Sequence, residues 1–296
     1  MRGKADIDPR IWKLFDGYVH GSMTRREFLD RAARFTASGV SAATILSALS
    51  PDYALARQVD PADPSISVAY KKYASPKGAG VMRGYFARPA KAGHRLPGVV
   101  VIHENRGLNP YIEDVARRLA VAGFIAFAPD ALTPLGGYPG NDDDGRALQS
   151  QRDGEEMTED FVAAVEFLRQ HPDSSGRVGA VGFCFGGGMV LELAIRLPDL
   201  DAGVAFYGRH PEAGRAAAIR APLMLNHAEL DERVNASWPD FETGLKAAAV
   251  DYVHHDYAGV QHGFHNDTTP RYDAKAAELA WARTVEFFEK HLEHDA

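Results

Sequence analysis

The single cysteine of this 296-residue chain, Cys184, lies in a pattern that would make its thiol reactive. It follows an apolar run at residues 178–183 that we expect to be a strand, and it precedes residues 188–194, which we expect to form a helix. A nucleophile between small residues at a strand-to-helix turn is typical of a nucleophile elbow, here with Cys in the place of Ser. The start of the following helix would favour the thiolate. The alternative is a small, buried cysteine on a packed strand.

Two further residues follow the cysteine in the order nucleophile, acid, histidine that an elbow nucleophile requires. Asp231 comes after an apolar run at residues 223–227, and His262 comes after another run at residues 252–257. Loops at the carboxyl ends of parallel strands meet in one crevice, so these side chains would converge. The imidazole would take the thiol proton, and the carboxylate would orient the imidazole. Neighbouring residues of the same types remain as alternatives: Glu229, Glu232 and His265.

Apolar runs and helical patterns alternate along the rest of the chain and would position these residues. We expect strands at residues 68–73, 81–88, 97–103, 124–128, 178–183, 202–207, 223–227 and 252–257. We expect helices at residues 110–122, 158–170, 239–248 and 273–291. The first two strands would form an antiparallel pair, and the alternation that follows predicts an α/β fold, a mostly parallel, doubly wound sheet with helices on both faces. A Pro-, Gly- and Asp-rich loop at residues 133–145 is long enough to be a lid or a pocket wall.

The N-terminus has two interpretations. We divide the chain into an N-terminal extension at residues 1–60 and a catalytic domain at residues 61–296. Residues 23–29 contain Thr24, Arg25 and Arg26 and resemble a twin-arginine export motif. A charge-free run at residues 35–51 and a small-x-small cleavage site at residues 54–56 follow it.

The other interpretation is that the extension forms amphipathic helices that pack on the body of the protein. Charged residues at Asp30, Arg31 and Arg34 interrupt the start of the apolar run, and residues 7–20 have the pattern of a folded helix. A periplasmic location by export and a cytoplasmic location therefore both stay open.

Composition excludes several classes of partner and cofactor. With a net charge of −7 and 25% charged residues, the chain has neither a nucleic-acid surface nor a basic membrane patch. The apolar run at residues 35–51 is too short for stable membrane insertion. One cysteine excludes an intramolecular disulfide. We expect no cofactor and no metal, because adjacent His254 and His255 would point to opposite faces of a strand and no acid lies at metal-ligand spacing from His262 and His265. The oligomeric state stays open.

Four segments together resemble the dienelactone hydrolase family, the carboxymethylenebutenolidases and their relatives, within the α/β-hydrolase superfamily. They are residues 99–109, 182–187, 230–231 and 262–264. The resemblance covers about residues 65–293. It implies a thiol-dependent hydrolase of small esters or lactones, in which the cysteine, histidine and aspartate above act as a triad and form an acyl-enzyme.

The resemblance also implies roles for three residues outside the triad. Glu104 matches the family glutamate that meets the cysteine in the resting enzyme and takes part in its activation. The backbone N–H groups of Phe185 and Asn105 would form the oxyanion hole, in agreement with the elbow rule. The alternative for Glu104 is a salt bridge to Arg106 or a carboxylate at a helix end.

One departure from the family pattern concerns the substrate. Asn266 stands four residues after His262, where the family pattern has an arginine. Arg106 and Arg209 are therefore candidates to bind a substrate carboxylate, and two more arginines remain as alternatives, Arg146 and Arg271. Other functions stay open: a hydrolase of thioester or peptide bonds, or a catalytically idle α/β-hydrolase-fold binding module. In each enzymatic case the partner is a small-molecule substrate.

Overall fold

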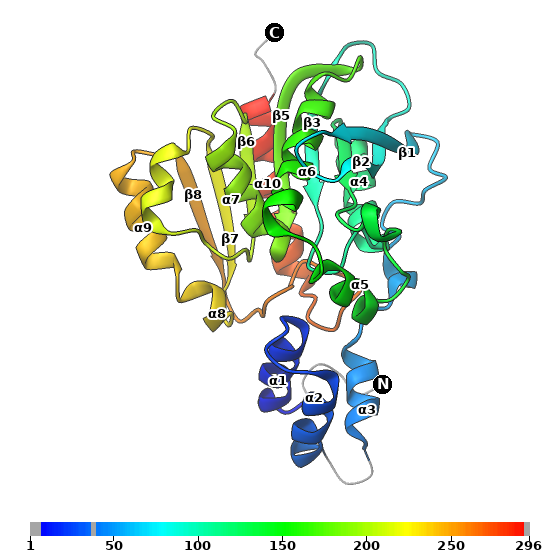
Figure 1. Cartoon of the computed structure of the whole chain (residues 1–296), viewed down its shortest axis with the longest axis vertical. Coiled ribbons are helices and arrows are strands. Elements are labelled where there is room, and N and C mark those ends of the chain that lie inside the picture. Colours follow the sequence, from blue (N-terminus) through cyan, green and yellow to red (C-terminus); the bar gives the residue numbers. More distant parts are fainter. Residues whose placement is uncertain (1–6, 37–39, 293–296) are drawn as a thin grey trace.

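The structure, a computed structural model, describes residues 7–36 and 40–292 (Figure 1). Its strands are β1 (Ile66–Ser75), β2 (Gly80–Pro89), β3 (Leu96–Ile102), β4 (Ile125–Pro129), β5 (Ser174–Phe183), β6 (Ala202–Phe206), β7 (Leu223–Ala228) and β8 (Tyr252–Tyr257). Its α-helices are α1 (Pro9–Val19), α2 (Arg25–Ala32), α3 (Ala42–Leu49), α4 (Pro110–Val121), α5 (Asp142–Gln149), α6 (Gly154–Arg169), α7 (Phe185–Arg196), α8 (Glu232–Asn235), α9 (Trp238–Ala247) and α10 (Ala274–Leu292). Short 3₁₀ helices lie at Ala33–Phe35, Tyr53–Leu55, Thr133–Leu135 and Ala213–Ala218.

All eight strands join one sheet in the order β1-β2-β4-β3-β5-β6-β7-β8. The pairs β1–β2 and β2–β4 are antiparallel, and the strands from β4 to β8 pair in parallel. This arrangement confirms the predicted α/β fold and the predicted antiparallel pair at the start of the domain. Because the central strands run in parallel, their carboxyl ends lie at the same edge of the sheet, where the candidate residues follow them.

Helices cover both faces of the sheet, as predicted (Figure 1). Helices α4 and α10 pack on one face, and α6, α7 and α9 pack on the other. Along β3, Val99 and Val101 belong to the first apolar cluster, whereas Val100 and Ile102 belong to the second. Such alternation is the period-two geometry of a strand, and burial on both faces explains why the central strands are continuous apolar runs.

Helices α1–α3 form a lobe beyond the strand ends, beside α5 and α8, and we call it the N-terminal lobe (Figure 1). It has an apolar cluster of its own, to which all three helices contribute, with Phe28 fully buried. Thr24 begins α2 with a capping box: its side chain accepts from the Glu27 N–H, and the Glu27 side chain accepts from the Thr24 N–H. The two arginines of the export-like motif are thus the first residues of a capped helix.

Two predicted boundaries are wrong. The loop expected at residues 133–145 is interrupted by a 3₁₀ turn and ends early, because Asn141 caps α5 and three aspartates occupy the first turn of that helix. The helix expected from residue 158 begins at Gly154, where Asp153 is its cap. Among the described residues, no helix combines the length and the apolarity needed to span a membrane.

Candidate active site

Cys184 lies at the turn between β5 and α7, as the elbow pattern predicts. Its backbone has φ 56° and ψ −112°, a conformation that a non-glycine residue rarely adopts and that marks functional turns. The turn is tight: a Cβ at Gly182 would lie 2.0 Å from the Gly186 carbonyl oxygen, and a Cβ at Gly186 would lie 2.2 Å from that of Ile102. Glycine at both positions therefore allows α7 to start directly against the sheet.

Asp231 follows β7 and His262 follows β8, and the structure brings the two side chains together. Asp231 Oδ2 lies 2.5 Å from His262 Nδ1, and both side chains are buried. The other carboxylate oxygen accepts from the Val234 N–H at the start of α8, which fixes the carboxylate. Although burial would raise the pKa of Asp231, the neighbouring His262 outweighs it and lowers the pKa. The carboxylate can thus hold the ring with Nε2 turned away from it.

A ring nitrogen of His262 lies within 4.8 Å of the Cys184 sulfur. Burial alone would raise the pKa of the thiol and lower that of the imidazole. Mutual attraction reverses both shifts: the thiol pKa falls well below its usual value, and the pKa of His262 rises to about 10, with Asp231 adding to the rise. The favoured state is therefore a thiolate beside an imidazolium.

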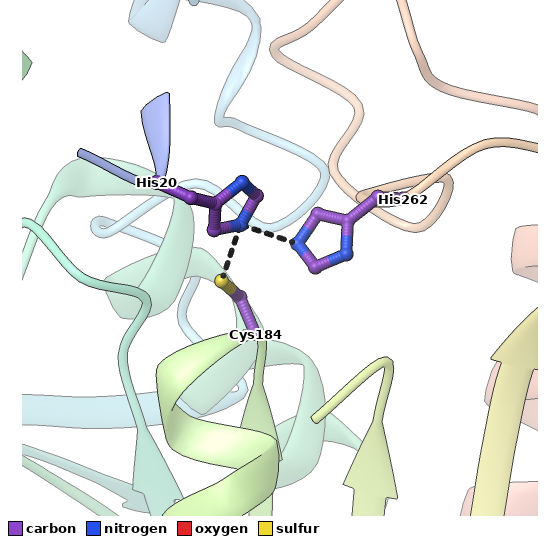
Figure 2. Close-up of side chains that lie close together, drawn as sticks. All are labelled: His20, Cys184 and His262. Atoms are coloured by element: carbon purple, nitrogen blue, oxygen red, sulfur yellow. Dashed lines mark hydrogen bonds between the residues drawn. The ribbon is translucent and has the colours of Figure 1, made fainter. Parts of the chain in front are cut away.

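A residue that the sequence analysis did not identify, His20 at the end of α1, contacts both of these groups. His20 Nε2 lies 3.4 Å from the Cys184 sulfur and 3.3 Å from His262 Nε2. Figure 2 shows one nitrogen of the His20 ring facing both the sulfur and the His262 ring. Its other nitrogen, Nδ1, faces Asp16, with the backbone oxygen at 2.8 Å and the carboxylate at 3.2 Å.

Glu104 follows β3 and is buried at the same edge of the sheet, but its partners differ from the one that the resemblance implies. It forms an ion pair of 3.0 Å with Arg106 and accepts a hydrogen bond of 3.1 Å from Asn266. The first contact is the alternative that the sequence left open. Burial raises the pKa of Glu104, and the Cys184 charge adds to the rise, although Arg106 opposes it. Asn266, which replaces the expected arginine, thus holds this acid.

The two residues expected to supply the oxyanion hole line one groove together with Cys184. Phe185 is the first residue of α7, so its N–H belongs to the helix turn that has no intrahelical acceptor. Asn105 follows Glu104, and its side chain donates to the Val19 carbonyl oxygen at 2.7 Å. Asn105 and Cys184 both line the two cavities described next.

Cys184 borders an inner cavity and an outer groove, and His20 lies on the wall of both. The inner cavity is small, about 30 Å³, room for about one water. The N-terminal lobe and the segment directly after it close the cavity with four apolar residues: Phe15, Val19, Leu49 and Pro51. The outer groove measures about 360 Å³ and is lined by Met189, Tyr207, Arg209, Pro211, Arg215 and Arg233, among others.

The candidate arginines differ in which of these two cavities they line. Arg106 lies on the inner cavity, held by Glu104 and, at 2.5 Å, by Asp142. Arg271 also lines the inner cavity, whereas Arg209 is exposed on the outer groove. Arg146 pairs with Asp143 and lines neither space.

In two groups of side chains within the described ranges, three possible ligand atoms lie within 4.8 Å of one another. The first is His20, Cys184 and His262, and the second is His227, His254 and Asp256 on β7 and β8. No such grouping is visible in the sequence, because each group joins residues that are far apart in the chain. His20 is 164 residues from Cys184, and its only sequence signal is its place at the end of an amphipathic helix.

Comparisons with known proteins identify relatives of this chain. The sequence profile of the Dienelactone hydrolase family matches residues 82–292, and a YqhI-like profile matches residues 2–34. A hydrolase fragment of Escherichia coli named YghX is 59% identical over 38% of this chain and 97% of its own length. A protein of Aquifex aeolicus named as a carboxymethylenebutenolidase is 35% identical over 71% of this chain and 94% of its own.

Solved structures give the same result. A dienelactone hydrolase-like promiscuous phosphotriesterase, P91, from metagenomic libraries superposes with a TM-score of 0.67 at 26% identity, covering 77% of this chain and all of its own. The predicted family is confirmed: the chain belongs to the dienelactone hydrolase family, hydrolases of lactones and esters with the α/β-hydrolase fold.

Proposed function

We propose that the protein is a thiol-dependent hydrolase of small esters or lactones that works through a Cys184–His262–Asp231 triad and an acyl-enzyme. The observation that carries the proposal is the 2.5 Å contact between Asp231 and His262 beside a strained elbow cysteine. This arrangement supplies a nucleophile, a base and a group that orients the base. The paired shifts of the thiol and imidazole pKa values support a thiolate as the attacking species.

The reaction takes place in two steps. The Cys184 thiolate attacks the substrate carbonyl carbon, and the N–H groups of Phe185 and Asn105 stabilise the oxyanion. His262 donates its Nε2 proton to the leaving alkoxide as the C–O bond breaks, which leaves a thioester on Cys184. Neutral His262 then takes a proton from water, the hydroxide attacks the thioester, and the carboxylic acid leaves as the thiolate re-forms.

The substrate enters by the outer groove, because the inner cavity holds about one water. Met189, Tyr207 and Pro211 offer apolar contact for a small acyl or alkyl group. Arg209 is placed to meet a substrate carboxylate, whereas Arg106 is already bound to Glu104 and Asp142. Small esters or lactones that carry an acid group fit this groove best.

The test is Cys184→Ala assayed with an activated aryl ester. We expect a loss on the order of 10⁴-fold in kcat with the fold intact, because alanine fits the same turn and removes only the nucleophile. Cys184→Ser should also be impaired, since a hydroxyl is far less acidic than a thiol. Activity of Cys184→Ala within tenfold of the wild type would rule out the triad.

A panel of thioesters and peptides beside the esters and lactones tests the choice of bond. Turnover of thioesters or peptides alone would replace the proposed bond but keep the nucleophile. No turnover of any of them, with binding retained, would indicate the idle binding module instead.

A further inference from the structure

We propose that the N-terminal lobe supplies a second Asp–His pair, Asp16–His20, to the active site, and that His20 is a catalytic residue that holds the Cys184 sulfur as a thiolate in the resting enzyme. The proposal rests on the proposed function in one respect, that Cys184 is the nucleophile. Its first support is contact with the reacting atom: His20 Nε2 is 3.4 Å from the sulfur (Figure 2). The family resemblance assigns no residue of residues 1–60 to the site.

The second support is the likeness between the two histidines. His262 Nδ1 faces the Asp231 carboxylate at 2.5 Å, and His20 Nδ1 faces Asp16, whose carboxylate lies at 3.2 Å. Each Nδ1 therefore carries a proton, and each Nε2 is directed to the other, 3.3 Å away. A carboxylate behind a histidine is the arrangement that keeps an imidazole ready to exchange a proton at its far nitrogen.

The short distance between the two Nε2 atoms determines where one proton lies. Two bare Nε2 atoms at 3.3 Å would set lone pair against lone pair, and two protonated ones would set hydrogen against hydrogen. One proton is therefore shared between the rings, and its source is the thiol. The S–H bond breaks, an N–H bond forms, and the products are a thiolate and one imidazolium distributed over His20 and His262.

The surrounding charges favour that state. Arg233 donates to His20 Nε2 at 2.9 Å, which places the shared proton mainly on His262 Nε2, and it lies 3.4 Å from His262 Nδ1. Its cation stabilises the thiolate and disfavours a second imidazolium. Asp16 is balanced by Arg233 at 3.5 Å and Arg271 at 3.6 Å.

The negative charge of Glu104 disfavours the thiolate, and Arg106 forms an ion pair with Glu104. Burial would lower the pKa of His20, yet the Cys184 charge and Asp16 raise it.

Contacts on several sides of the lobe hold His20 in place. The Val19 carbonyl oxygen, directly before His20, accepts from Asn105 at 2.7 Å. Arg271 lies 4.8 Å above the Phe15 ring, a cation–π distance. At the periphery the lobe is tied to the body by Arg25–Asp143 at 2.8 Å and by Lys13–Glu232 at 3.2 Å. The ring is thus positioned by the fold of the lobe and by the loop after β3.

The experiment measures the reactivity of Cys184 itself, in the full-length protein and without substrate. Iodoacetamide alkylates the thiolate, so its rate against pH gives the thiol pKa. The variants are His20→Gln and Asp16→Asn, and the matched controls are His94→Gln and Asp30→Asn, which change exposed residues of the same types. Thermal unfolding of each variant verifies that it is folded.

We expect His20→Gln to raise the alkylation midpoint by about one pH unit or more, because the imidazolium beside the thiolate loses one of the two rings that share its proton. Alkylation below the midpoint would then be about tenfold slower than in the wild type. Asp16→Asn should shift the midpoint in the same direction by less, and it keeps the ring in place. The controls should leave the midpoint where it is.

An unchanged midpoint in both variants overturns the proposal. It does so even if the alkylation rate at high pH rises, because a faster rate alone would mean that His20 only covers the sulfur. This outcome differs from a failure of the proposed function. The triad fails if Cys184→Ala still hydrolyses esters, whereas the role of His20 is read from the thiol pKa with no ester present.

Discussion

The proposed active site combines two Asp–His pairs that are built in different ways. In the body, Asp231 and His262 come from loops after β7 and β8, and the hydrogen bonds of the sheet fix their separation. In the N-terminal lobe, Asp16 and His20 lie one turn apart on α1, and contacts between the lobe and the body bring them to the sulfur. The first pair is a property of the fold, and the second depends on docking.

The two regions also differ in how firmly they are held. The body has continuous apolar clusters on both faces of its sheet, whereas the lobe has a separate apolar cluster. Several ties between lobe and body are exposed polar pairs such as Lys13–Glu232, with side chains 81% and 85% exposed. Pairs of this kind stabilise little. Docking of the lobe is therefore the step that local opening would reverse first.

The largest expected effect distinguishes the role of His262 from that of His20. His262→Gln should reduce kcat/KM on the order of 10⁴-fold, because the proton-transfer group of both steps is lost. His20→Gln should reduce it by about 10- to 100-fold, since the thiolate is less populated but the triad is intact. The measurement is steady-state hydrolysis of an aryl ester at several pH values, with His94→Gln as the control. Equal losses for the two variants would contradict the division between a body pair and a lobe pair.

A charge change at Glu104, in the body, can be compared with the change at His20, in the lobe. Glu104→Gln removes a negative charge near the sulfur, so the thiol pKa and the alkylation midpoint should fall, opposite to the shift expected for His20→Gln. Turnover should nevertheless decrease, because Arg106 loses one of its two carboxylate partners and the loop after β3 carries Asn105.

Alkylation profiles and turnover of this variant are compared with those of Glu278→Gln, an exposed acid on α10. If Glu104→Gln matches the wild type in both measurements, Glu104 has a structural role only.

The same contrast explains what could be predicted from the sequence. The sheet, the elbow and the residues of the proposed triad follow from short-range patterns, because each apolar run is one strand and each candidate residue directly follows its strand. The contact of Glu104 with Asn266 depends on loops 162 residues apart, and no spacing reveals it. The place of His20 in the site could not be predicted for the same reason. In addition, the pattern around Arg25 and Arg26 is shared by export signals and by capped helices.

A change of the arginine pair in α2 should have the smallest effect on the structure and the largest effect on export. Arg25→Lys combined with Arg26→Lys should change the unfolding midpoint by no more than about 2 °C, because the Arg25–Asp143 pair is exposed and lysine preserves its charge. An export receptor reads the arginine pair rather than its charge. A fusion of residues 1–60 to a reporter should therefore lose export in this variant if the motif is a signal.

The mature N-terminus determines which use of the segment accompanies catalysis. Cleavage after Ala56 would give a protein that begins at Arg57 and lacks both Asp16 and His20. The second Asp–His pair requires the opposite: full-length protein by mass spectrometry in the active fraction, with α1–α3 resistant to protease while docked. A fully active protein that begins at Arg57 and has an unshifted alkylation midpoint would remove the lobe from the mechanism and leave the body pair to act alone.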